Sequence, residues 1–220
     1  MIRIEPHPEP PDFDQKVRNR GRTWLRNKIN LEKRQAPSHW NACRDAVERM
    51  FSSRCGYLAS YLTSGHVDHF VSWNRCKKTD QHHLAYEWTN LRWIHPQLNS
   101  AKSDHELVDP FEVADDWFEL DLLSLRLIVH EERIPQARRA AVQRTVEKLQ
   151  LDDGPIAEKL RREAVDLFRE GISMHKLHER APMVARALER LQDATALDPI
   201  RTRLRDELLR ARSAARCSAE

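Results

Sequence analysis

The feature of this sequence that most constrains its fold is a pair of short apolar runs with a proline two residues after the second run. The first run covers residues 67–71 and comes after a Ser-Gly pair at positions 64 and 65; the second covers residues 91–94. Apolar runs of this length beside turn residues are typical of β-strands. Pro96 suits the first turn of a helix, where its missing N–H costs no hydrogen bond. The sequence therefore predicts a strand, loop, strand and helix unit.

Chemistry-bearing side chains lie at the end of the first strand. Strict alternation would place His66 and Asp68 on one face and His69 on the other. We therefore expect the strand to end or twist at Asp68 and His69, so that both line one site. On the predicted helix, Asn99 and Lys102 are three residues apart and share a face.

These residue types suit the hydrolysis of a phosphodiester. An imidazole is the side chain whose ordinary pKa best suits removing a proton from water near neutral pH. Carboxylate and amide oxygens suit Mg²⁺ or Mn²⁺, which would neutralise charge on the phosphate. One Asp, one Asn and one His would be enough for a one-metal site. The non-functional alternative is that Asp68 is a surface carboxylate that pairs with the neighbouring imidazole.

Three stretches resemble a known family, and they read GHVDHFVSW, AYEWTNLRW and NSAKSDHELVDPF. Their order of His, Asn and Asn is that of HNH endonucleases. They are similar to the HNH enzymes found beside ATPases in bacterial antiphage defence operons, a group that includes the Septu nuclease subunit PtuB and retron-associated HNH proteins. Similarity extends to PPDFDQKV and TVEKLQLDD, although only the central block is specific.

The resemblance assigns roles to individual residues. It implies that His69 is the general base, that Asp68 and Asn99 bind the metal, and that Asn90 fastens the loop to the strands as part of the catalytic unit. His66 falls where related enzymes can place an acidic residue near the metal; the alternative is a loop histidine.

Phosphate contacts are less well defined. Lys102 is either a phosphate contact or part of a solvated helix face. Related sequences often continue after DHF with an Ile-Pro-Lys-Ser type of segment, whereas this chain has Val71-Ser72-Trp73. Lys77 or Lys78 would then replace the missing lysine.

A structural zinc is not expected. Many HNH relatives brace the fold with zinc held by two CxxC pairs, and this sequence has no CxxC. Packing would brace the hairpin instead, through a small core drawn from Trp88, Leu91, Trp93 and Leu98.

A basic stretch lies near the start of the chain. Residues 16–34 hold eight basic side chains against one acidic residue, Glu32, and the eight are Lys16, Arg18, Arg20, Arg22, Arg26, Lys28, Lys33 and Arg34. The stretch is either a solvated helix face or an arm that contacts DNA phosphates, in which case its affinity would fall steeply with salt. Arg22 and Arg26 are the candidate DNA contacts.

Composition indicates a helix-rich globular chain. Hydrophobic residues make up 40% and charged residues 32%, with only five glycines. No apolar run is long enough to cross a bilayer, and the first residues lack a signal-peptide core, so we expect a cytoplasmic protein without membrane contact. Four scattered cysteines suit a reducing compartment.

The expected fold class is α+β and mostly helical, with a central ββα-metal unit inside a helical scaffold. We expect helices near residues 14–30 and 38–51, the latter capped by Ser38, and one or two short strands within residues 109–129. Persistent helices follow from about residue 135, with starts at Pro155, Pro182 and Pro199. The expected regions are 1–54 (helical, with the basic stretch), 55–130 (nuclease core) and 131–220 (helical, for partner docking).

The resemblance also implies partners. An HNH subunit of a Septu-like system associates with an ABC- or SMC-like ATPase, PtuA, and acts on DNA in antiviral defence. Two alternatives stay open at this point: a stand-alone nuclease of the restriction or homing type, and a non-catalytic DNA-binding or assembly subunit. A target other than DNA, such as transfer RNA, is also open.

Overall fold

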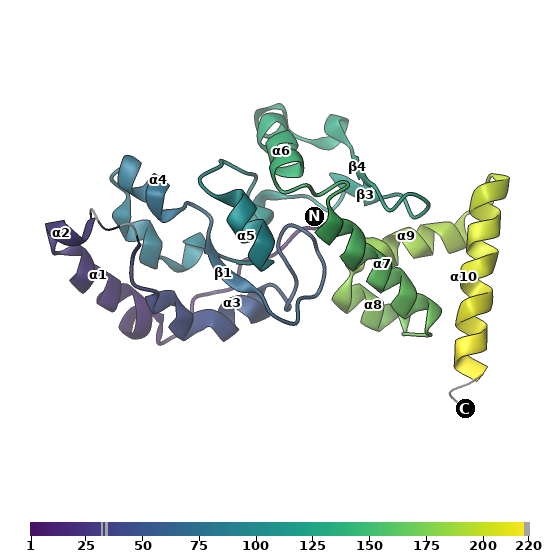
Figure 1. Ribbon diagram of the computed structural model, residues 1–220, viewed down its shortest axis with the longest axis horizontal. Helices are drawn as coiled ribbons and strands as arrows, with labels where there is room; N and C mark the ends of the chain where they lie inside the picture. The colour runs from purple at the N-terminus through teal and green to yellow at the C-terminus, as the bar shows by residue number, and fades with distance from the viewer. Residues whose placement is uncertain (32, 34, 218–220) are drawn as a thin grey trace.

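The computed structural model describes residues 1–31, 33 and 35–217 (Figure 1). It is mostly helical and contains two small antiparallel sheets, which confirms the expected α+β class. The long axis runs from α1 (Asn19–Leu25) and α2 (Lys28–Leu31) at one end to α10 (Pro199–Cys217) at the other (Figure 1).

The centre of the molecule is the predicted strand, loop, strand and helix unit. Strand β1 (His66–His69) pairs antiparallel with β2 (Leu91–Ile94), and α5 (Pro96–Lys102) follows. The second strand has the predicted bounds, and the helix begins at Pro96 and carries Asn99 and Lys102, as predicted. The first strand was expected over residues 67–71 and instead ends at His69, in agreement with the inference that it stops at this point.

Close packing and local caps hold this unit. Trp93 lies against Gly65, where an added Cβ would come within 2.4 Å of the indole. Pro96 begins α5, and the His95 ring accepts a hydrogen bond from the Gln97 amide at 3.3 Å. The four side chains expected to brace the hairpin are all buried: Trp88, Leu91, Trp93 and Leu98.

The loop between β1 and β2 contains helices that the sequence analysis missed. They are α4 (Trp73–Lys78), η3 (His82–Tyr86) and η4 (Trp88–Asn90). Ser72 caps α4 by accepting a hydrogen bond from the Arg75 amide at 3.2 Å. The capping serine is the sequence signal that would have predicted this helix.

The N-terminal segment is helical where expected, but in shorter pieces. A π-helical turn, η1 (Asp14–Arg18), leads into α1, while a 3-10 turn, η2 (His39–Cys43), leads into α3 (Arg44–Met50). The expected Ser38 cap was wrong, because its side chain makes no capping hydrogen bond. Phe13 is fully buried and meets the Trp88 ring edge-on.

The rest of the chain follows the predicted order. Two short strands form the second sheet, β3 (Phe118–Leu120) and β4 (Leu127–Val129), flanked by the turns η5 (Pro110–Glu112) and η6 (Glu131–Arg133). Five helices follow: α6 (Gln136–Lys148), α7 (Pro155–Arg169), α8 (Met174–Arg180), α9 (Pro182–Asp193) and α10. Three of them begin at the predicted prolines.

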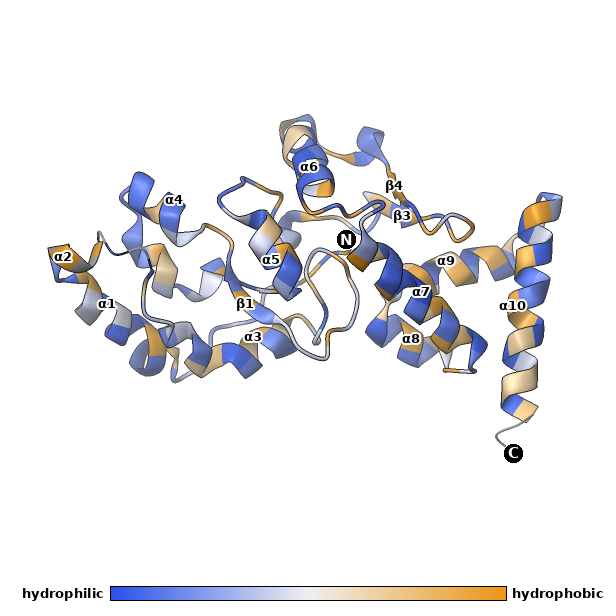
Figure 2. Cartoon of the chain, viewed as in Figure 1, coloured by the Kyte–Doolittle hydropathy of each residue, from blue (hydrophilic) through white to orange (hydrophobic). Residues whose placement is uncertain are grey.

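Apolar side chains gather in two cores. The larger core joins side chains between Met1 and Ala157, together with Met183. The smaller core joins Leu120 to side chains between Ala164 and Leu208. Both expected region boundaries, 54/55 and 130/131, fall within the stretch that builds the larger core. Apolar and polar residues alternate along α7 and α10 (Figure 2), as in helices that pack through one face.

Across the described part of the chain, we find no helix with the length and apolar character needed to cross a membrane.

Candidate active site

Asp68 is a buried carboxylate on β1 and is only 6% exposed. The Lys102 ammonium lies 3.0 Å from its Oδ1, which accepts a hydrogen bond, and 2.9 Å from its Oδ2. Burial raises the pKa of Asp68, and the charges of Lys102 and then Arg92 oppose that rise. The carboxylate thus sits where a positive charge is needed to keep it ionised.

Lys102 is the last residue of α5 and is 2% exposed. Besides Asp68, its ammonium donates to the backbone carbonyl of His69 at 2.5 Å. Of the two roles expected for Lys102, a phosphate contact or part of a solvated helix face, the solvated face was wrong, because the side chain is buried. The long side chain instead connects the helix to the end of β1.

The His69 ring is held by two neighbours. Its Nε2 lies 2.8 Å from the carbonyl oxygen of Ala85, and the Trp40 ring meets it edge-on with centroids 4.3 Å apart. A carbonyl oxygen only accepts hydrogen bonds, so Nε2 carries the proton and Nδ1 carries the lone pair.

The protonation state of His69 follows from its enclosure. Burial lowers the pKa of His69 to about 4; the bond to Ala85 acts in the opposite direction, and the charge of Lys102 lowers the pKa further. The imidazole is therefore neutral at pH 7, with Nδ1 able to accept a proton.

Asn90 ties the loop to the strand end. Its Oδ1 accepts from the Val71 amide at 2.7 Å, while its Nδ2 donates to the carbonyl oxygens of Val71 at 3.1 Å and Leu84 at 2.9 Å. Leu84 precedes Ala85, so the same side chain fixes the loop whose carbonyl orients His69. This is the loop-fastening geometry that the family resemblance implies.

Asn99 and His66 differ in their surroundings. Asn99 is half-buried on α5, one turn before Lys102 and on the same face. His66 is exposed at the start of β1, close enough to His95 for its charge to lower the pKa of that residue, after burial as the larger cause. His66 thus lies beside His95, whereas Asp68 faces Lys102.

The other expected phosphate contacts lie on exposed helices. The Lys77 ammonium donates to the Lys33 carbonyl at 3.4 Å, and that of Lys78 lies 3.5 Å from Asp104. Arg22 and Arg26 are exposed on and just after α1.

The basic side chains of residues 16–34 differ in their contacts. Arg18 is mostly buried and pairs with three acidic side chains, Glu9, Asp14 and Glu87, and Lys16 pairs with Asp12. Glu32 and Arg34 lie outside the described residues. Arg18 is therefore a structural residue, and the exposed arginines are the ones available to a phosphate.

Asp68 and Asn99 are the two oxygen-bearing side chains expected to hold a divalent cation. Among the described residues, no three His, Cys, Asp or Glu side chains gather as a metal-binding group. However, Asp68 Oδ2 is buried and accepts no hydrogen bond, although the Lys102 ammonium lies 2.9 Å away. One carboxylate and the Asn99 amide would leave most ligand positions to water and phosphate.

The cysteines lie apart from this site. Cys43, Cys55 and Cys76 are buried free thiols, and Cys217 is exposed at the end of α10. Burial raises the pKa of Cys43 and Cys76 to about 11, which keeps both as thiols.

Several residues around the site had no sequence signal of their own. Trp40 and Ala85 both contact the His69 ring, although they are 29 and 16 residues away from it in the sequence. Arg92 binds both carboxylate oxygens of Asp109, which leaves Lys102 as the cation nearest Asp68. Tyr57 is fully buried; burial and then the charge of Asp68 raise the pKa of its hydroxyl.

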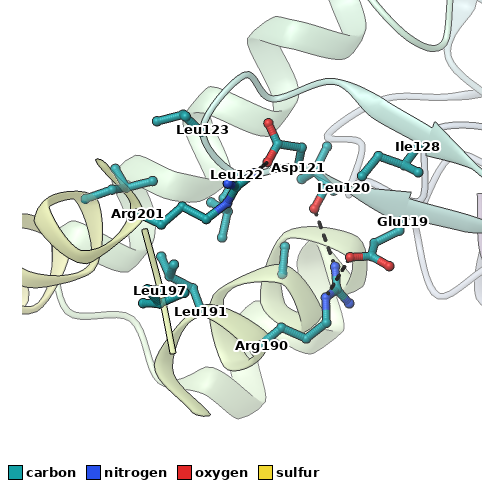
Figure 3. Close-up of a pocket in the computed structure, with 12 residues that line it drawn as sticks. Glu119, Leu120, Asp121, Leu122, Leu123, Ile128, Arg190, Leu191, Leu197 and Arg201 are labelled. Atoms are coloured by element: carbon teal, nitrogen blue, oxygen red, sulfur yellow. Dashed lines mark hydrogen bonds and ion pairs between the residues drawn. The ribbon is translucent and has the colours of Figure 1, made fainter. Parts of the chain in front are cut away.

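A separate pocket of about 250 Å³ lies at the other end of the molecule, between the β3–β4 hairpin, α9 and the start of α10 (Figure 3). Leucines line much of it, including Leu122, Leu191 and Leu204. Its charges pair with one another: Glu119 with Arg190 at 3.1 Å and Asp121 with Arg201 at 3.3 Å (Figure 3). Leucines and paired charges thus share the lining of this hollow.

Comparison with protein families, with curated proteins and with solved structures finds no match to this chain. The function is therefore argued from the site itself.

Proposed function

We propose that this protein is a metal-dependent HNH endonuclease that hydrolyses phosphodiester bonds of DNA. The observation that carries the proposal is His69, a neutral imidazole oriented by the Ala85 carbonyl, beside a buried carboxylate that requires a cation. A base and a cation site at one strand end are what hydrolysis of a phosphodiester needs.

His69 would act at Nδ1. As water attacks phosphorus, a new P–O bond forms, the water proton passes to Nδ1, and the bond to the leaving oxygen breaks. The charge of the resulting imidazolium would be shared with the Ala85 carbonyl, to which Nε2 donates. A pKa of about 4 guarantees the unprotonated form but makes a weak base, so the anionic phosphate must strengthen it when it binds.

Asp68 and Asn99 are the residues that would hold Mg²⁺ or Mn²⁺. The ion supplies charge neutralisation at the phosphate and at the departing oxygen. Asn90 contributes by fixing the loop that orients His69. His66 is exposed and close to His95, and would contact the substrate backbone more readily than the ion.

The substrate face would include the exposed cations of the N-terminal half. Arg22 and Arg26 are exposed and Lys77 is half-buried, and long cationic side chains bind phosphates through charge rather than sequence. The Lys77 ammonium also lies 6.0 Å from the centre of the Trp73 ring, and basic side chains beside aromatic ones support a nucleic-acid substrate.

The wider role we propose is that of an effector in antiphage defence, with an ATPase subunit as its partner. The C-terminal helices and the apolar pocket beside α10 offer a docking surface at the end of the molecule away from α1. A non-catalytic DNA-binding subunit is the second candidate. The observation that favours it is the Lys102 ammonium, which already balances Asp68 without a metal.

Replacing His69 by Ala tests the proposal. We expect at least a hundredfold loss of plasmid cleavage in Mg²⁺ or Mn²⁺, because general base catalysis is typically worth 10²–10⁴ in rate. DNA binding, measured by fluorescence anisotropy, should change little. His83→Ala is the matched control, since His83 is exposed on η3, and should cleave as the unaltered protein does. Undiminished cleavage by His69→Ala would refute the assignment.

A further inference from the structure

Four charges lie close together behind the strand end, and they balance. The carboxylates of Asp68 and Asp109 face the cations of Lys102 and Arg92, and all but Asp109 are less than 9% exposed. Arg92 is committed to Asp109 and to two backbone carbonyls, those of Thr89 and Leu91. Lys102 is therefore the cation that can leave without breaking the other pair.

The backbone at the end of α5 is held in place independently of the Lys102 ammonium. Asp104, two residues later, accepts a hydrogen bond from the Ser72 hydroxyl at 2.8 Å and so ties the end of α5 to the start of α4. The flexible tetramethylene stem allows the ammonium to move while the helix stays in place.

A divalent ion and the ammonium compete for the same carboxylate. Lys102 lies within 3.0 Å of both oxygens of Asp68, so a metal bound there would meet a like charge at close range. If the metal replaced the ammonium, this buried group would hold one positive charge in excess. One phosphodiester anion would restore the balance.

We propose that Lys102 is a resident counter-ion that keeps divalent cations off Asp68 until a substrate phosphate draws its ammonium away. This inference rests on the proposed nuclease function and adds regulation to the same site. Metal loading and substrate binding then favour one another, and the protein without DNA binds metal weakly.

The test is metal binding, measured without cleavage. Mn²⁺ is titrated into the full chain without DNA and followed by electron paramagnetic resonance and by the shift in melting temperature. We expect Lys102→Met to bind Mn²⁺ at least tenfold more tightly than the unaltered protein. Lys159→Met is the matched control, because Lys159 is exposed on α7, and should leave the affinity unchanged. Equal or weaker binding by Lys102→Met would overturn the proposal.

A folding defect in Lys102→Met stays informative. Removing the ammonium leaves Asp68 buried and unpaired, so the variant is expected to melt lower without metal. Mn²⁺ should restore its melting temperature, followed by circular dichroism, and a failure to do so would also count against the proposal. The double variant Asp68→Asn with Lys102→Met removes both charges and should show no response to Mn²⁺.

A second Mn²⁺ titration, carried out with DNA present, tests the role of the substrate phosphate. A short duplex should raise the Mn²⁺ affinity of the unaltered protein, with the duplex alone as the blank, whereas a methylphosphonate duplex, which lacks the charge, should not. An equal effect of both duplexes would contradict the inference. The two proposals can also fail separately. If Lys102→Met binds Mn²⁺ tightly but the unaltered protein cleaves no DNA, the counter-ion role of Lys102 is upheld and the nuclease function is refuted.

Discussion

At the residue scale, His69 shows how enclosure decides the charge of an imidazole. The ring lies between Trp40 and the Ala85 carbonyl, and the Lys102 ammonium is near. Each neighbour has a different effect: the aromatic ring removes water, the carbonyl selects the tautomer, and the ammonium disfavours a second positive charge. The result is a proton acceptor that is ready at neutral pH.

The depressed pKa of His69 predicts a loss of stability in acid. In the unfolded chain the imidazole takes up a proton near pH 6.5, whereas in the folded protein it does so only near pH 4. Its stabilising contribution is complete above pH 6.5 and is lost as the pH falls through 4, and amounts to about 3 kcal/mol. We expect urea unfolding of the unaltered protein to show a steeper decline over this range than that of His69→Gln.

The glutamine variant is the suitable comparison because its amide can still donate to Ala85 but does not titrate. Parallel pH profiles for the two proteins would contradict the expected pKa of His69.

At the element scale, the end of α5 depends on one unfavourable backbone conformation. Ser103 has φ 46° and ψ −126°, a region that favours glycine, and its side chain is exposed. This turn stops the helix at Lys102 and leads the chain to Asp104, which anchors it to α4. Local strain thus determines where the ammonium is placed.

Replacing Ser103 by Gly should relieve this strain. We expect about 1 kcal/mol of added stability and a melting temperature higher by about 2–4 °C. Ser100→Gly, inside the same helix, should have the opposite sign, since glycine is unfavourable in a helix interior. Calorimetry that showed destabilisation by both glycines would contradict the strain at Ser103.

Elements with local signals were predictable from sequence. The strand Leu91–Ile94 has its predicted bounds and α5 begins at the predicted Pro96, because an apolar run and a proline mark these positions. The helix α4 was missed although Ser72 caps it. The contacts of Lys102 were not predictable, since a lysine at a helix end is equally compatible with solvent, and only the packing of α5 against β1 brings it to Asp68.

The candidate site residues could be predicted from the sequence, whereas the side chains that contact them could not. Asp68, His69, Asn90 and Asn99 stand out by type and spacing, and the order in which they occur points to one chemistry. The contact between Trp40 and His69 joins segments that share no local pattern. Such long-range contacts depend on how η2 packs against η3, which no periodicity in the sequence encodes.

At the scale of the whole molecule, the candidate active site and the apolar pocket lie on different cores. The site belongs to the larger core, whereas the pocket joins β3 to α9 and α10 around the smaller one. Large apolar side chains are exposed at this end, among them Leu123 at 47% and Ile200 at 63%. Exposed apolar groups beside a hollow are typical of an interaction surface.

The double variant Leu123→Asp with Ile200→Asp tests this surface. We expect it to weaken binding of the proposed ATPase partner at least tenfold, because two charges would be buried in an apolar contact. Ile29→Asp, on α2 at the opposite end, is the control and should bind normally, since Ile29 is also an exposed apolar residue, at 72%. The affinity of each variant for the partner is measured by interferometry. Unimpaired binding by the double variant would rule this surface out.

The distribution of thiols makes the C-terminal helix directly observable. Since Cys43, Cys55 and Cys76 are enclosed, a maleimide dye applied to the folded protein will attach at Cys217 alone. A single fluorophore at the tip of α10 then reports, without any engineered mutation, when another macromolecule approaches that end of the molecule.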